Sequence, residues 1–235
     1  MTLAHLVLLV VFTSLALLCI WGLQRAVTLA DALLRRPRHA ALHSALVVDD
    51  ASPCVTVQVP LFNEPAVCER AVDAACSLAW PRLEVQILDD SDGADATGAL
   101  VAARVAHHVA RGVDVHHLVR TERRGYKAGA LAHGMALSRG EFLAVLDADF
   151  APAPDFLARA MTSFAPGIDM VQARWSHHNR GASWLTRAQA ALLDAHFRIE
   201  QRGRANAGRF FGMNGTAGIW RKSAVARAGG WDART

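Results

Sequence analysis

The feature that most constrains this chain is an apolar run near its amino terminus. Residues Leu6–Leu23 include no charged side chain. With its flanking residues, the run reaches the ~20 residues that a helix needs to cross the ~30 Å hydrocarbon core of a bilayer. A cleavable signal peptide would carry basic residues before the run, whereas here they follow it, at Arg25, Arg35–Arg36 and Arg38. The run therefore predicts a membrane-spanning anchor; the alternative is a buried helix of a soluble core.

The basic residues also predict an orientation. Because positive flanking charge stays on the cytoplasmic side of a span, we expect an outside amino terminus and a cytoplasmic remainder. We divide the chain into an anchor at 1–25, a juxtamembrane linker at 26–51 and a cytoplasmic domain at 52–235. The linker is expected to be amphipathic or irregular, and Pro37 would end a helix there.

Composition excludes several other classes of protein. A chain of 235 residues with 52% hydrophobic and 20% charged residues is not disordered or of low complexity. Four cysteines without a C-x-x-C pair predict reduced thiols rather than the disulfide framework of a small secreted protein. The net charge of +4 is small and its basic residues are dispersed, so we expect no nucleic-acid partner. The sequence leaves the oligomeric state open.

Beyond Ser52 the pattern alternates between strand and helix. Short apolar or alternating segments predict strands at 55–59, 83–88, 113–119, 142–146 and 170–174. Apolar residues at helical spacing predict helices at 67–78, 96–111, 128–137 and 154–164. Strands that alternate with helices of this length are joined by right-handed crossovers into a largely parallel sheet. The predicted fold class is α/β.

Four polar motifs follow the first four predicted strands. They are PLFNE at 60–64, DDSD at 89–92, RRGYKAG at 123–129 and DAD at 147–149. The carboxyl ends of parallel strands meet at one rim of an open α/β sheet, and such sheets bind their ligands there. Each motif alone indicates little, but together they predict a binding site at that rim.

The chemistry of two motifs suits a phosphorylated ligand. Asp147 and Asp149 offer hard oxygen ligands for Mg²⁺ or Mn²⁺, a cation that usually arrives with substrate phosphates. Their alternative role is to form a turn and cap a helix. Lys127 lies where a helix opens, so its ammonium and the helix amides could meet a phosphate. A solvated lysine is the alternative.

Each of the remaining candidate site residues also has a structural role as the alternative to binding a ligand. Asp89 and Asp90 are like charges that are costly to bury unless they bind something, or they form a turn before the next helix. Glu64 either hydrogen-bonds a ligand or occupies the first turn of its helix. The segment Phe210–Thr216 joins two aromatic residues to a glycine-rich turn where backbone could approach a ligand. Asn206–Arg209 before it is expected to be a loop.

Taken in chain order, these segments resemble the membrane-bound family-2 glycosyltransferases, and most closely their cellulose-synthase-like, glucomannan-synthase-like branch. The resemblance rests on VQVPLFNE, LDDSD, RRGYKAGAL, LDADFAP, VQARW and FFGMNGTAGIWR, and it covers the chain from about Ser52 onward. It implies a GT-A fold, the fold of nucleotide-diphospho-sugar transferases. It also implies inverting transfer of a hexose from a UDP- or GDP-sugar donor to a polysaccharide or lipid acceptor at the membrane.

The resemblance implies roles for individual residues as well. Glu64 and Asp90, with Asp89 as a further candidate, would hold the base and ribose. Lys127 would face the diphosphate, and Asp147 with Asp149 would bind it through Mg²⁺ or Mn²⁺. The donor-sugar and acceptor side would be formed by Phe211, Gly212, Met213, Asn214, Gly215 and Thr216.

Two later motifs of the family do not follow in this chain. The family takes its general base from a TED-type motif after a GGW segment, but here Gly229–Trp231 is followed only by four residues. Its later QxxRW motif is missing too, since Gln172–Trp175 is one spacer short and lies on an earlier strand. We therefore expect an amino-terminal fragment that binds nucleotide and metal but has no general base, and so shows little or no transfer.

The sequence also leaves two other classes of protein to compare with a glycosyltransferase. One is a membrane-anchored nucleotide-binding remnant or partner subunit without catalysis, which the missing base favours. The other is a phosphohydrolase of the haloacid-dehalogenase type, which also uses a D-x-D motif but needs an acidic pair later in the chain. After Asp149 no two acidic residues are adjacent, so this second class has little support.

Overall fold

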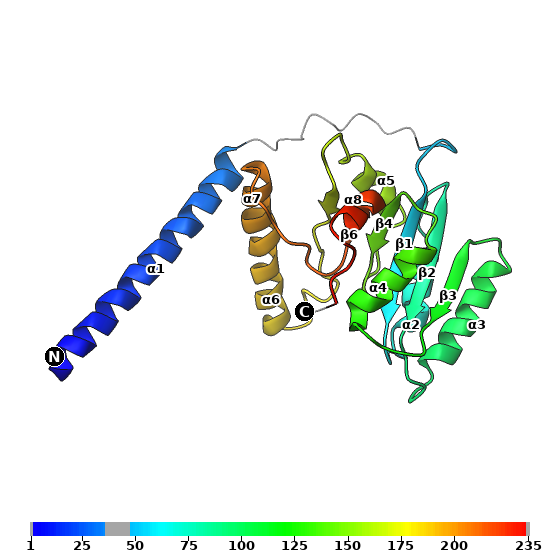
Figure 1. Ribbon diagram of the computed structural model, residues 1–235, viewed down its shortest axis with the longest axis horizontal. Helices are drawn as coiled ribbons and strands as arrows, with labels where there is room; N and C mark the ends of the chain where they lie inside the picture. Colours follow the sequence, from blue (N-terminus) through cyan, green and yellow to red (C-terminus); the bar gives the residue numbers. More distant parts are fainter. Residues whose placement is uncertain (1, 36–47, 234–235) are drawn as a thin grey trace. The chain divides into compact units, whose positions relative to one another are not determined.

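The computed structural model describes residues 2–35 and 48–233 (Figure 1). The described residues form two compact units. The first contains the amino-terminal helix together with residues 174–212, and the second contains the sheet, within residues 48–173 and 213–233. The domain predicted at 52–235 contains residues of both units, because residues 174–212 are grouped with the amino-terminal helix.

The second unit is built on a mixed sheet of six strands, in the order β3-β2-β1-β4-β6-β5. β1, β2, β3 and β4 run parallel, whereas β6 lies antiparallel between β4 and β5. The predicted α/β fold with a largely parallel sheet is therefore confirmed. The strands are β1 (Val55–Leu61), β2 (Leu83–Asp89), β3 (Val115–Val119), β4 (Phe142–Val145), β5 (Met170–Gln172) and β6 (Gly218–Arg221).

Four helices of this unit correspond to the four predicted helices, and a fifth, α8, was not predicted. They are α2 (Cys68–Cys76), α3 (Thr97–Val109), α4 (Tyr126–Leu137), α5 (Phe156–Met161) and α8 (Lys222–Arg227). α4 packs on β1 and β2, and Leu131 of this helix joins a core cluster with Leu88 and Val145. This packing fixes where α4 begins relative to the ends of the strands.

The contact between α4 and the sheet is close because of one glycine. Gln58 and Gln86 are buried side by side on β1 and β2, and Gln58 Nε2 donates to Gln86 Oε1 at 3.0 Å. A Cβ on Gly134 of α4 would lie 2.5 Å from that same nitrogen and 2.8 Å from that same oxygen. Since real Cβ atoms do not approach so closely, only glycine lets the helix pack at this distance.

The first unit begins with a long apolar helix, α1 (Leu3–Leu34). Its most apolar 18-residue window has a mean hydropathy of 2.7 and none of it is buried, so α1 is a candidate membrane span. The helix continues nine residues past the expected anchor end at Arg25, so the first part of the expected linker is helical. It ends three residues before Pro37, and residues 36–47 lie outside the described part of the chain.

The carboxyl-terminal end of α1 packs against a continuous helical segment. This segment consists of α6 (Trp184–Ala195), the π-helix η2 (His196–Gln201) and α7 (Arg202–Asn206). Arg25 pairs with Glu200 at 2.9 Å, and buried Asp31 pairs with Arg209. Asn206 is the last residue of α7 rather than part of the expected loop, and its side chain donates to the carbonyl of Arg35 at 3.0 Å.

Candidate functional site

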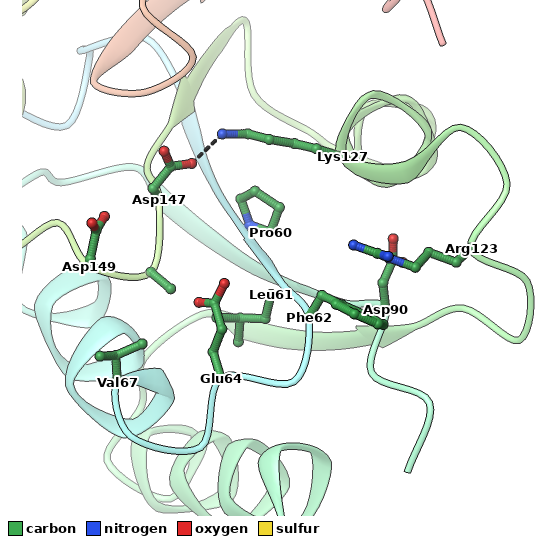
Figure 2. Close-up of a pocket in the computed structure, with 11 residues that line it drawn as sticks. Pro60, Leu61, Phe62, Glu64, Val67, Asp90, Arg123, Lys127, Asp147 and Asp149 are labelled. Carbon is green, nitrogen blue, oxygen red and sulfur yellow. Dashed lines mark hydrogen bonds and ion pairs between the residues drawn. The ribbon is translucent and has the colours of Figure 1, made fainter. Parts of the chain in front are cut away.

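A cleft of about 460 Å³ opens at the carboxyl ends of β1 and β4 and the start of α4 (Figure 2). This volume lies in the range of sites that bind small molecules. All four polar motifs that were predicted to converge contribute to it. The residues that line the cleft are Pro60, Leu61, Phe62, Glu64, Val67, Asp90, Arg123, Lys127, Asp147, Ala148 and Asp149.

The turn after β4 carries Asp147 and Asp149 into the cleft. The backbone N–H of Asp147 donates to Thr216 Oγ1 at 2.8 Å, and the Asp147 carboxylate forms an ion pair with Lys127. Lys127 Nζ also donates to the carbonyl of Gly215 at 2.8 Å. A lysine at the start of α4 thus joins the end of β4 to the segment before β6.

Glu64 brings a third carboxylate to this side of the cleft (Figure 2). Its pKa is raised, first by burial and then by the negative charges of Asp149 and Asp147, and Lys127 offsets this only partly. The neighbouring negative charges therefore disfavour ionisation of Glu64. A bound divalent cation would relieve that repulsion, so the residues present fit the Mg²⁺ or Mn²⁺ that the sequence predicted.

The protein alone offers few metal ligands. Within residues 2–35 and 48–233, no group of three or more His, Cys, Asp or Glu side chains could hold a metal ion. Asp147 and Asp149 are the two carboxylates on the turn after β4.

Asp90 is buried, and it lies at the opposite end of the cleft from Asp147 (Figure 2). Its carboxylate accepts two hydrogen bonds from Arg120, of which that from Nε measures 2.6 Å. Beside it the guanidinium of Arg123 lies 3.3 Å from the centre of the Phe62 ring. This end of the cleft therefore offers a fixed acceptor next to a flat cationic and aromatic surface.

Asp89, the further candidate beside Asp90, is not among the residues that line the cleft. It is the last residue of β2 and only 2% exposed. Its carboxylate accepts the backbone N–H of Ser91 at 2.9 Å and lies 2.8 Å from His117 Nε2. Burial tends to raise the pKa of Asp89, but the hydrogen bonds from His117 and Ser91 outweigh it and lower the pKa. Asp89 thus fixes the turn after β2, and Asp90 faces the cleft.

The glycine-rich segment predicted at the sugar side is divided between the two units. Gly215 and Thr216 contact Lys127 and Asp147, as described above. Met213 packs on the core cluster, and the Asn214 N–H donates to Gln172 Oε1 at 3.1 Å. Phe211 and Gly212 belong to the first unit, where the carbonyl of Gly212 accepts a hydrogen bond from Gln201 at 3.3 Å.

Three residues that contribute to this region were not among the predicted site residues. Arg120 pairs with Asp90, and Arg123 stacks on Phe62. Gln172 Nε2 donates to the carbonyl of Thr216 at 2.9 Å, so its side chain holds the segment before β6. Arg120 directly follows the third strand, and that position is its sequence signal. Arg123 begins the RRGYKAG motif at 123–129, which was predicted to reach the rim as a whole.

Comparisons with known proteins agree with this fold. The model of the family described as "Glycosyl transferase family 2" matches residues 56–226. Glucomannan 4-beta-mannosyltransferase 2 of Arabidopsis thaliana is 43% identical over 190 residues, 78% of this chain and 35% of that protein. Probable glucomannan 4-beta-mannosyltransferase 3 of Oryza sativa subsp. japonica is 44% identical over 192 residues, 79% of this chain and 35% of that protein. The chain thus spans about a third of the length of these relatives.

A solved structure shows the same fold. It is the mannosyltransferase PcManGT from Pyrobaculum calidifontis in complex with GDP-Man and Mn²⁺, with a TM-score of 0.60 and 23% identity. The likeness covers 90% of this chain and 60% of that one, and it confirms the predicted GT-A fold. The predicted family is confirmed as well, because its model covers most of the sequence: the chain belongs to glycosyl transferase family 2.

Proposed function

We propose that this chain binds a nucleotide-sugar donor and a divalent cation in the cleft, for inverting transfer of a hexose to a glycan or lipid acceptor at a membrane. The observation that carries the proposal is that Asp147, Asp149 and Lys127 meet in one cleft with a buried acceptor, Asp90. The curated relatives are named mannosyltransferases, which supports a mannosyl group as the hexose.

The residues of the cleft divide into a phosphate end and a nucleoside end. Asp147 and Asp149 would hold Mg²⁺ or Mn²⁺, which would supply Lewis-acid stabilisation of the charge on the diphosphate leaving group. Lys127 orients the diphosphate at the start of α4. At the other end, Asp90 accepts hydrogen bonds from the ribose and base. Glu64, which lies on the side of Asp147 and Asp149, is a further proposed acceptor for the nucleoside. We assign the general base to none of the described residues.

We further propose that α1 anchors the chain in the membrane with the cleft on the cytoplasmic side. The support is the exposed apolar surface of α1 and the position of Arg25 and Arg35 toward its carboxyl end. Resistance of the membrane-bound chain to alkaline carbonate extraction would test the anchor. Cleavage of an amino-terminal tag by protease added outside sealed cells would test the orientation.

The binding proposal is tested with the full chain in detergent micelles. We expect calorimetry to show binding of GDP or UDP that strengthens when MnCl₂ is added. Asp149→Ala should abolish the metal-dependent part, while Asp155→Ala should leave it unchanged. Asp155 is a suitable control, because it is an exposed aspartate nearby that does not line the cleft. Unchanged metal dependence in Asp149→Ala would overturn the assignment of that carboxylate.

Transfer is tested separately from binding. The same preparation is incubated with radiolabelled GDP-mannose or UDP-glucose, and product is sought in the polymer and lipid fractions. Incorporation that needs Mn²⁺ and is lost in Asp149→Ala would support transfer. Binding without incorporation would support the non-catalytic, nucleotide-binding alternative.

A further inference from the structure

One side chain outside the cleft joins its nucleoside end to its phosphate end. Arg120 follows β3 and does not line the cleft, and its side chain is 13% exposed. Its Nε donates to Asp90 Oδ1 at 2.6 Å, and Nη2 donates to the other oxygen of the same carboxylate. Two parallel bonds of this kind fix both the position and the plane of a carboxylate.

The remaining donors of Arg120 hold the turn that begins α4. Nη1 donates to the carbonyl of Arg124, and Nη2 also donates to that of Tyr126, each at 3.1 Å. The next residue in the chain is Lys127. The guanidinium therefore lies between the acceptor Asp90 and the backbone from which Lys127 extends.

That turn has a backbone conformation that needs support. Gly125 and Tyr126 both have positive φ, 74° and 47°, and for a tyrosine this conformation is unfavourable. One turn later, a Cβ on Gly129 would overlap the carbonyl oxygen of Arg124 and lie 2.8 Å from Arg120 Nη1. The close approach of Gly129, together with the two bonds from Arg120, keeps the turn in this shape.

We propose that Arg120 is a positioning residue of the donor site, which holds the Asp90 carboxylate as the acceptor for the ribose hydroxyls and fixes the turn that presents Lys127. This inference rests on the proposed nucleotide site. Arg120 touches neither ribose nor phosphate itself. It sets the spacing between the two groups that do, so it matches the cleft to a ribonucleoside diphosphate rather than to a phosphate alone.

The chain offers a matched control for the loss of Arg120. Glu84 lies at the opposite end of β2 from Asp90 and is equally buried, with 3% of its side chain exposed. It accepts hydrogen bonds from the side chain and backbone of Arg139, which does not line the cleft. Arg139→Met therefore also deprives a buried carboxylate, that of Glu84, of its arginine partner. The change lies away from the proposed site.

The experiment compares two ligands on the full chain in detergent micelles with MnCl₂. Calorimetry measures the affinity of GDP and of 2′,3′-dideoxy-GDP, with UDP and its dideoxy analogue as the second pair. In the wild type we expect the ribose hydroxyls to strengthen binding by roughly 10- to 100-fold, as hydrogen bonds to a charged acceptor do. We call the affinity of the ribonucleotide divided by that of its dideoxy analogue the ribose ratio. In Arg120→Met the two ligands should bind almost equally, so this ratio should fall to about one. Arg139→Met should keep the wild-type ribose ratio.

The outcomes separate this inference from the proposed function. Failure of the wild type to bind either nucleotide would overturn the nucleotide site itself. Wild-type binding without a ribose effect, or an unchanged ratio in Arg120→Met, would overturn only the role of Arg120. Arg120→Lys keeps the positive charge but cannot form the two parallel bonds to Asp90. A folded Arg120→Lys chain with a smaller ratio of ribonucleotide to dideoxynucleotide affinity supports the inference. Unfolding of both Arg120 variants while Arg139→Met stays folded would assign Arg120 to the fold and overturn its role in the site.

Discussion

The backbone N–H of Asp147 donates to the hydroxyl of Thr216 across 69 positions of sequence, at 2.8 Å. This bond joins the turn after β4 to the segment before β6, and Thr216 is only 1% exposed. Lys127 spans the same two segments, because it pairs with the Asp147 carboxylate and donates to the carbonyl of Gly215. The proposed metal ligand Asp147 is thus held from its backbone as well as from its side chain.

We expect Thr216→Val to destabilise the sheet unit. The valine keeps the shape of the threonine but leaves the Asp147 N–H without its acceptor, at a cost of about 1–3 kcal/mol. Urea unfolding followed by tryptophan fluorescence measures the change. Thr162→Val is the control, because Thr162 makes only an exposed bond to the carbonyl of Arg159, and we expect a change within ±0.5 kcal/mol. Equal effects of the two substitutions would contradict the role of Thr216.

We expect the Cys76 thiol to resist alkylation in the folded chain. Burial, with a smaller effect of the Asp73 carboxylate, raises the pKa of Cys76 to about 12. At pH 8 only about one molecule in 10⁴ would then carry the reactive thiolate. Peptide mass spectrometry after iodoacetamide treatment should find Cys76 unmodified in the native chain and modified in urea. Equal modification in both conditions would show that the thiol is not buried.

The sequence predicted those parts of the fold whose signals are local. Apolar alternation located β1 and β2, and the polar motifs at strand ends located the rim where the cleft lies. β6 was not predicted, and it pairs antiparallel between two strands that come earlier in the chain. Its place in the sheet depends on the tertiary structure rather than on a pattern within Gly218–Arg221.

A local sequence pattern also does not decide which of two adjacent aspartates, Asp89 or Asp90, faces the cleft. Asp89 ends β2 and Asp90 follows it, so one points toward His117 and the other toward the cleft. Their partners lie far along the chain, since Arg120 is 30 residues from Asp90 and His117 is 28 from Asp89. Residue type and spacing identified the pair of carboxylates, and the register of β2 and β3 decided their roles.

We expect Gly203→Ala to loosen the packing of α7 on α1. A Cβ at Gly203 would overlap the carbonyl oxygen of Thr28, so one of the two helices must move. Overpacking of this kind typically costs about 1–3 kcal/mol. Hydrogen exchange over residues 196–209 should become faster. Gly181→Ala is the control, because nothing lies within 4 Å of a Cβ there, and exchange should not change. Unaltered exchange in Gly203→Ala would contradict the close contact.

We expect an acid-sensitive contribution to stability from Asp73 of α2. Its carboxylate accepts hydrogen bonds from Arg104 at 2.5 and 2.6 Å, and lies 2.7 Å from His108. The bonds from Arg104 and His108 lower the pKa of Asp73, although burial opposes them. Because the pKa is lower in the folded chain than in the unfolded one, the carboxylate stabilises the fold above the unfolded pKa, about 3.9. This contribution is lost as the pH falls through the folded pKa.

Comparison of wild type with Asp73→Asn isolates that contribution. Since 39% of the Asp73 side chain is exposed, the difference in unfolding free energy at pH 7 should be about 1 kcal/mol or less. Urea unfolding between pH 3 and pH 7 should show the difference between the two chains shrink below pH 4. Asp155→Asn removes an exposed carboxylate 3.9 Å from Arg159, and this control should match the wild type throughout. A difference for Asp73→Asn that stays constant down to pH 3 would show that lost packing, rather than lost charge, causes the destabilisation.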